Sequence, residues 1–110
     1  MTEPMTRGGD PRFHAVLDEI RVMHERKGSD YGTSLDIFAN VRASEEFGIQ
    51  AWKGAVLRAN DKMARLKTYF TKGTLANEGV DDSLLDLANY AAIALVLFRE
   101  ANGTIKESER

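Results

Sequence analysis

Apolar residues recur along this chain at intervals of three and four, the spacing that places side chains on one face of an α-helix. The first such segment predicts a helix over residues 11–26, with Asp10 as the N-terminal cap and Pro11 as the first helical residue. Its apolar face comprises Phe13, Val16, Leu17, Ile20 and Met23. The glycine-containing segment 27–32 then predicts a loop.

The middle of the chain predicts two more helices. A shorter helix is expected over residues 35–46, and Gly48 is a suitable stop signal. A long helix is expected from about Gln50 to Thr71, with apolar residues along one side. The segment 72–80 contains two glycines and is expected to be a loop.

A fourth helix is predicted from about Asp81 to Ala101 and is ended by Asn102-Gly103. No segment has the pattern of a strand, so the predicted fold class is all-α. We expect a compact four-helix bundle over residues 11–103, preceded by a disordered arm (1–10) and followed by a frayed tail (104–110).

Length limits what this fold can bury. A chain of 110 residues forms one domain with a modest stability margin, and helical chains of this size often gain stability by forming homo-oligomers. The longest apolar run, 84–98, is too short for a membrane span and contains Asp86 and Asn89. The polar N-terminus shows no signal peptide, so we expect a cytoplasmic protein without a membrane partner.

Charge and cysteine content exclude several function classes. The formal net charge of -2 argues against a general nucleic-acid binder, which would be basic. The absence of cysteine excludes disulfides and thiolate metal sites. A metal site would need carboxylate, His or carbonyl ligands, which favour Mg²⁺ or Mn²⁺.

Polar residues interrupt the fourth helix on one face. Asp82, Asp86 and Asn89 are spaced i, i+4, i+7 within a helix that is apolar on most sides. A buried carboxylate is costly without a partner, so Asp86 requires a cation, a metal or several donors. Two interpretations remain open: Asp82 caps the helix while Asp86 forms one internal salt bridge, or the two carboxylates bind a divalent ion.

The third helix carries a charged stripe with matching spacing. Its members are Arg58, Asp61, Lys62 and Arg65. Such stripes are usually solvated faces with ion pairs. Alternatively, this stripe faces that of the fourth helix, so that Asp61 joins the carboxylates and the cations meet phosphates.

The predicted loop 27–32 is a third candidate. Lys27 could contact a phosphate and Tyr31 could stack on a base. Taken alone, however, the Gly and Asp residues of this segment are ordinary turn residues.

Three segments together resemble a known family, the nucleotide-modification-associated domain of phages and bacteria, which is itself similar to MazG-like all-α nucleotide pyrophosphohydrolases. The segments are Arg58-x-x-Asp61-Lys62-x-x-Arg65-Leu66, Asp82-Ser83-Leu84-Leu85-Asp86-Leu87-Ala88-Asn89-Tyr90-Ala91 and Lys27-x-x-Asp30-Tyr31-Gly32. The resemblance spans about residues 13 to 100. It implies a MazG-like four-helix fold in dimers or tetramers and, for phage-encoded members, action in the host cytoplasm.

The implied activity is Mg²⁺-dependent cleavage of a (deoxy)nucleoside triphosphate to a monophosphate and pyrophosphate. Asp82 and Asp86 would hold metal, and Asp61 would hold metal or orient the water. Phosphate charge would be bound by Lys62, Arg65 and Arg58. The sugar and base would be contacted by Lys27, Asp30, Tyr31, Asn89 and Tyr90.

The acidic set departs from the family pattern. Asp61-Lys62-x-x-Arg65 stands where MazG-like enzymes have Glu-Glu-x-x-Glu, and Ser83 stands at a Glu position three residues before Asp86. Two further hypotheses therefore accompany the hydrolase: a non-catalytic nucleotide-binding protein, and a structural protein whose polar stripes specify oligomer assembly.

Overall fold

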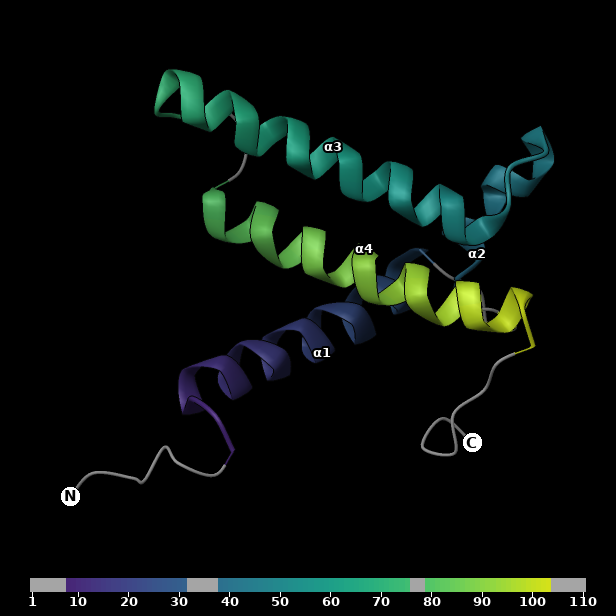
Figure 1. The fold of residues 1–110 in the computed structure, drawn as a ribbon, viewed down its shortest axis with the longest axis horizontal. Helices are drawn as coiled ribbons and strands as arrows, with labels where there is room; N and C mark the ends of the chain where they lie inside the picture. Colours follow the sequence, from purple (N-terminus) through teal and green to yellow (C-terminus); the bar gives the residue numbers. More distant parts are fainter. Residues whose placement is uncertain (1–7, 32–37, 76–78, 104–110) are drawn as a thin grey trace.

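The computed structural model describes residues 8–31, 38–75 and 79–103, without the side chains of residues 28–31. Helices make up its regular structure: α1 (Pro11–Tyr31), α2 (Ala39–Arg42), the 3-10 helix η1 (Ala43–Phe47), α3 (Ala51–Lys72) and α4 (Val80–Ala101) (Figure 1). No strand occurs among the described residues. The all-α prediction is confirmed.

Helix α1 begins as predicted but ends later. The Asp10 carboxylate accepts a hydrogen bond from the backbone N–H of Arg12 at 2.7 Å, ahead of Pro11 as the first helical residue. The predicted loop at 27–32 is wrong through Tyr31, because α1 continues through Gly28. Glycine costs a helix about 1 kcal/mol relative to alanine, and α1 continues through Gly28 despite this local preference.

The other helix boundaries follow the glycine signals. The segment after Phe38 forms the short α2 and then the tighter η1, while residues 35–37 of the predicted second helix lie outside the described residues. Gly48 ends η1 with a φ of 77°, a conformation that glycine adopts without strain. Helices α3 and α4 match the expected ranges within one residue.

The start of α4 differs from the interpretation in which Asp82 caps this helix. Its N-cap is Gly79, and no side chain caps it by a hydrogen bond. The capping role considered for Asp82 is therefore wrong. Asp81 and Asp82 still lie in the first turn of α4, where negative charge interacts favourably with the helix dipole.

Helices α3 and α4 run in opposite directions side by side, and the core lies between them and α2 (Figure 1). Small residues on α3 and α4 allow these two helices to approach each other closely. The core cluster comprises Val41, Ala51, Ala55, Ile93, Ala94 and Leu97. At the end of this core, the Trp52 and Phe98 rings meet edge to face with centroids 5.2 Å apart.

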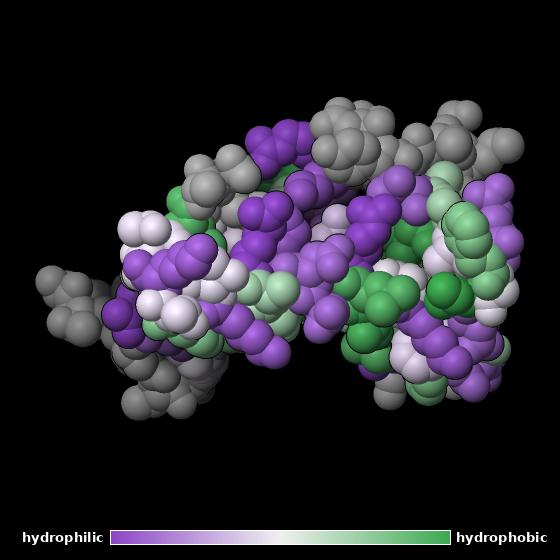
Figure 2. Space-filling model, turned by 90° about the horizontal axis from the view of Figure 1, so that it is seen from above, coloured by the Kyte–Doolittle hydropathy of each residue, from purple (hydrophilic) through white to green (hydrophobic). Residues whose placement is uncertain are grey.

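Helix α1 crosses α4 on the side away from α3, which leaves an open arrangement (Figure 1). The Cα radius of gyration is 16.3 Å, against about 13 Å for a compact domain of this length. Large apolar side chains also remain exposed, and some are visible in green in Figure 2. The expected compact bundle is thus all-helical but open. The predicted arm and tail, apart from residues 8–10, lie outside the described residues.

None of the described helices has the length and apolar character needed to cross a membrane.

Candidate functional site

The centre of the candidate site is Asp86, which contacts two lysines from two other helices. Its Oδ1 accepts a hydrogen bond from Nζ of Lys27 on α1 at 2.9 Å. Its Oδ2 lies 2.9 Å from Nζ of Lys62 on α3. The side chains of Asp86, Lys62 and Lys27 are 9%, 18% and 32% exposed. The sequence requirement that Asp86 find a cation is therefore met by two ammonium groups of the protein, which tie three helices together.

The two lysines determine the charge state of Asp86. Burial by itself raises the pKa of this carboxyl, but the hydrogen bonds from Lys27 and Lys62 and their positive charges outweigh burial, so the pKa is lowered. Asp86 is therefore ionised at neutral pH. Counted by themselves, the three described side chains Lys27, Lys62 and Asp86 carry one net positive charge.

The residues of the charged stripe on α3 lie in two different environments. Lys62 reaches α4, as the interpretation of facing stripes requires, and Arg65 is half-buried one turn further along α3. Arg58 and Asp61 are exposed and line a different hollow, of about 330 Å³, between α3 and the α2–η1 segment. The structure thus joins Lys62 of the stripe to Asp86 and leaves Arg58 and Asp61 at the surface.

The carboxylates predicted to bind Mg²⁺ are not assembled for that purpose. Asp82 is exposed and lines a hollow with Asp18, Glu19 and Arg26 of α1. Among the residues that the structure describes, no group of three or more Asp, Glu, His or Cys side chains could hold a metal ion. Both oxygens of Asp86 already face ammonium groups, which repel a cation. The described residues therefore do not fit the predicted Mg²⁺ site.

Asn89 occupies a second, largely apolar part of the site. Its side chain is buried, with 3% exposed, and lines a hollow of about 250 Å³ between α1 and α4. The other lining residues are Leu17, Ile20, Arg21, His24, Phe38, Ala92, Ile93 and Val96. Within the described part of the chain, the Asn89 amide has no hydrogen-bond partner, and neither of its polar atoms is sealed from solvent. This amide is free to pair with a ligand in the hollow.

Tyr90 lies elsewhere. It is half-buried and packs against the core cluster between α3 and α4 instead of lining the hollow with Asn89. Its predicted contact with the ligand stays a prediction. The side chains of Asp30 and Tyr31, also predicted to contact the ligand, lie outside the described residues.

Sequence reasoning missed two aromatic residues of this hollow. The rings of His24 and Phe38 lie 5.8 Å apart between centroids, tilted by 31°. A signal for His24 existed, because it precedes Lys27 by three residues and shares its helix face. Phe38 follows residues outside the described ranges, and its approach to α1 depends on tertiary structure alone.

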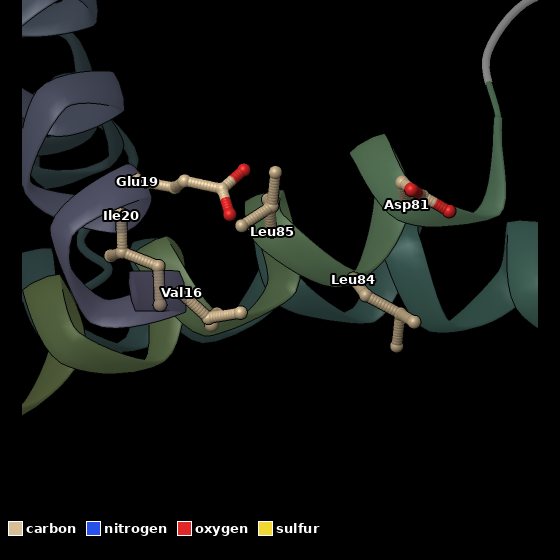
Figure 3. Close-up of a pocket in the computed structure, with 7 residues that line it drawn as sticks. Val16, Glu19, Ile20, Asp81, Leu84 and Leu85 are labelled. Atoms are coloured by element: carbon tan, nitrogen blue, oxygen red, sulfur yellow. The ribbon is translucent and has the colours of Figure 1, made fainter. Parts of the chain in front are cut away.

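A further hollow between α1 and α4, of about 240 Å³, lies near the start of α4 (Figure 3). Its walls are mostly apolar and include Val16, Ile20 and Leu84, and Glu19 extends across it toward Leu85 (Figure 3). With acidic groups as its main polar lining, this hollow is unsuited to an anionic ligand.

Comparison with family models, curated proteins and solved structures finds no match for this chain.

Proposed function

We propose that this protein binds a phosphorylated nucleotide, with Lys27 and Lys62 holding phosphate and Asn89 contacting the base or sugar. The observation that carries the proposal is the pair of ammonium groups held 2.9 Å from the two oxygens of Asp86. Lysine is a common phosphate ligand in proteins. Here two lysines from different helices converge, and a single carboxylate keeps them in place.

The electrostatics of the cluster support an anionic ligand. Lys27 and Lys62 carry positive charge that attracts phosphate, and both lysines keep an exposed part. A phosphate would approach each ammonium group on the side away from Asp86, since the carboxylate repels it. Asp86 then acts as a positioning residue, because it holds the two lysine side chains in place before the ligand arrives. Ligand binding therefore costs less conformational entropy of these side chains.

The position of Asn89 favours a nucleotide over inorganic phosphate as the ligand. Asp86 and Asn89 lie three residues apart on α4, as do His24 and Lys27 on α1, so the two parts of the site are one helical turn apart. An amide both donates and accepts hydrogen bonds, which suits the polar edge of a base. The apolar walls of the hollow suit the faces of a ring.

Binding without turnover is the function proposed. The pyrophosphohydrolase activity implied by the family resemblance remains a prediction. It requires carboxylates that hold Mg²⁺, and the described residues do not gather Asp61, Asp82 and Asp86 into such a group.

Titration calorimetry with each dNTP and NTP, with and without Mg²⁺, tests the proposal. We expect binding in the absence of Mg²⁺, and at least tenfold weaker binding for Lys62→Gln. The matched control is Lys67→Gln, an exposed lysine of the same helix, for which we expect no change. The proposal is excluded if none of the dNTPs and NTPs binds.

Chromatography of the same mixtures separates the binder from the hydrolase. We expect intact nucleotide after prolonged incubation. Mg²⁺-dependent release of pyrophosphate would show that the protein hydrolyses the nucleotide, and it would contradict binding without turnover.

A further inference from the structure

A groove between α1 and α4 is formed by two adjoining hollows, of about 240 Å³ and about 350 Å³. Glu19 and Leu85 line both hollows, so the two are parts of one surface. The lining residues fall within residues 16–26 of α1 and 81–88 of α4, and this surface is called the acidic groove below. Residues 16–26 correspond to about 15 Å of helix. The groove is therefore long enough to hold about three turns of another helix.

The walls of the acidic groove are largely apolar and remain partly accessible to solvent. Val16 and Val22 of α1 are 43% and 49% exposed, and Leu84 of α4 is 51% exposed. Met23, which also lines the groove, is buried. The described residues thus leave a surface against which further apolar side chains can be buried, and such burial is favourable.

Acidic side chains accompany these apolar walls. The charged lining residues are Asp18, Glu19, Arg26, Asp81 and Asp82. Figure 3 shows Glu19 of α1 and Asp81 of α4 on either side of the apolar lining residues. Asp18 has an ion pair within its own helix, but no described residue forms one with Glu19, Asp81 or Asp82. The described lining therefore attracts positive charge.

We propose that the acidic groove binds a basic amphipathic helix of a partner protein. Leucine-like side chains of the partner helix lie against Val16 and Leu84, and its lysine or arginine side chains lie beside Glu19 and Asp81. Recognition of this kind places an apolar helix face in a groove through anchors spaced by three and four residues. Charge complementarity selects a basic helix, because an acidic one would bring like charges together.

The acidic groove is distinct from the hollow that contains Asn89. Among the described residues, Ile20 is the only one that lines both. The two surfaces also differ in charge, since Lys27 and Lys62 beside Asp86 attract anions and the groove attracts cations. Binding of the partner helix therefore does not depend on the nucleotide binding proposed above.

Fluorescence anisotropy with synthetic peptides tests the charge and the shape of the partner. The probe is a labelled helical peptide of about four turns, with leucine on one face and lysine on the other. One control peptide has glutamate in place of lysine, and a second has the same residues in an order that gives no apolar face. We expect the lysine peptide to bind, and each control to bind at least about tenfold more weakly. No binding of the lysine peptide, or equal binding of the reordered one, would overturn the proposal.

Paired variants of the protein test the position of the charged contacts. Glu19→Gln combined with Asp81→Asn removes one carboxylate from each helix of the groove. Glu45→Gln combined with Glu46→Gln makes the same change in net charge on η1. We expect about fivefold weaker peptide binding for the first pair, because two exposed ion pairs are lost, and no change for the second. Equal weakening by both pairs would show that the peptide responds only to overall charge, and it would refute the groove as the site.

A second comparison tests the apolar wall. Leu84→Asn lies in the groove and Leu57→Asn lies on α3, and the two leucines are 51% and 54% exposed. We expect about tenfold weaker peptide binding for Leu84→Asn, no change for Leu57→Asn, and unchanged helix content by circular dichroism for both. Full binding by a folded Leu84→Asn variant would contradict the proposal.

Light scattering coupled to size-exclusion chromatography distinguishes a foreign helix from a second copy of this chain. We expect the number of protein chains in the particle to be the same with and without the lysine peptide. A dimer that the peptide converts to monomers would assign the groove to self-association and overturn the proposal. None of these measurements requires nucleotide.

Discussion

The interface between α3 and α4 and the interface between α1 and α4 use similar apolar residues with different results. Between α3 and α4, Ala55 is fully buried and Leu97 is 2% exposed. On α1, Met23 is the one side chain that is buried among those described, while Leu17 remains 46% exposed. Alanines at the first interface allow close packing. Helix α1 instead depends on Met23 and on the ion pair between Lys27 and Asp86.

The largest expected effect separates these two interfaces with one type of substitution. Leu97→Ala removes the largest fully buried side chain and is expected to lower the free energy of unfolding by about 3 kcal/mol, since the cavity cannot collapse fully. Leu17→Ala on α1 should cost less than about 1 kcal/mol, because that side chain is half exposed. Urea denaturation measures both. Equal losses would show that the interfaces do not differ in packing.

The next effect concerns the ion pairs that connect the helices. Asp86→Asn keeps the shape of the side chain but removes the charge that holds Lys27 and Lys62. We expect a loss of about 2 kcal/mol in the free energy of unfolding, less than for a fully buried pair because both lysines can turn toward solvent. Asp82→Asn is the control, as Asp82 is exposed on the same helix.

Hydrogen exchange shows which helices lose stability in Asp86→Asn. In Asp86→Asn, amide exchange should accelerate more in α1 than in the α3 core, since α1 loses one of its two main attachments. Uniform acceleration across all helices would indicate that the ion pairs support the whole fold equally.

A third prediction concerns the contact of α3 with the segment before it. A Cβ at Gly54 would lie 2.9 Å from Cβ and 2.5 Å from Oγ of Ser44. Replacing a helical glycine with alanine normally stabilises a protein by up to about 1 kcal/mol. Here we expect Gly54→Ala to destabilise by about 1 kcal/mol instead, because η1 must move. Adding Ser44→Gly should recover part of the loss, and thermal unfolding of both variants provides the measurement.

The smallest effect is the pH dependence of the Asp86 cluster. The pKa of Asp86 is lower in the folded protein than its ordinary value of 3.8, so the unfolded chain binds this proton more readily. The stabilisation is therefore complete above the unfolded pKa and is lost as pH falls through the folded pKa. The stability difference between the unmodified chain and Asp86→Asn should be constant from pH 5 to 7 and shrink below about pH 4. A difference that grows on acidification would contradict the assignment.

Local sequence signals predicted most of the helical framework. Helical spacing located α3 and α4 within one residue, and Gly48 ended a helical segment where expected. The burial of Asp86 followed from the apolar composition around it, as did its need for a cation. These features depend on residues that are close in sequence, where periodicity and turn chemistry act directly.

Features that depend on distant residues were not predictable in the same way. The glycine at position 28 favours a break, yet α1 continues past it. Lys27, just before this glycine, pairs with a residue 59 positions away. The α3 stripe has uniform spacing, but Lys62 contacts α4 while Arg58 and Asp61 line the hollow beside η1, and this division depends on how the helices cross. Likewise, His24 and Phe38 meet through tertiary structure.

The separation of Lys27 and Asp86 along the chain has a kinetic consequence. Helices α3 and α4 are joined by a short connection and can pair early in folding, at a small cost in loop closure. The contact from α1 closes a loop of 59 residues, so we expect it to form after that pair. Substitutions at Lys27 should therefore accelerate unfolding while leaving the folding rate nearly unchanged, which corresponds to a φ-value near zero.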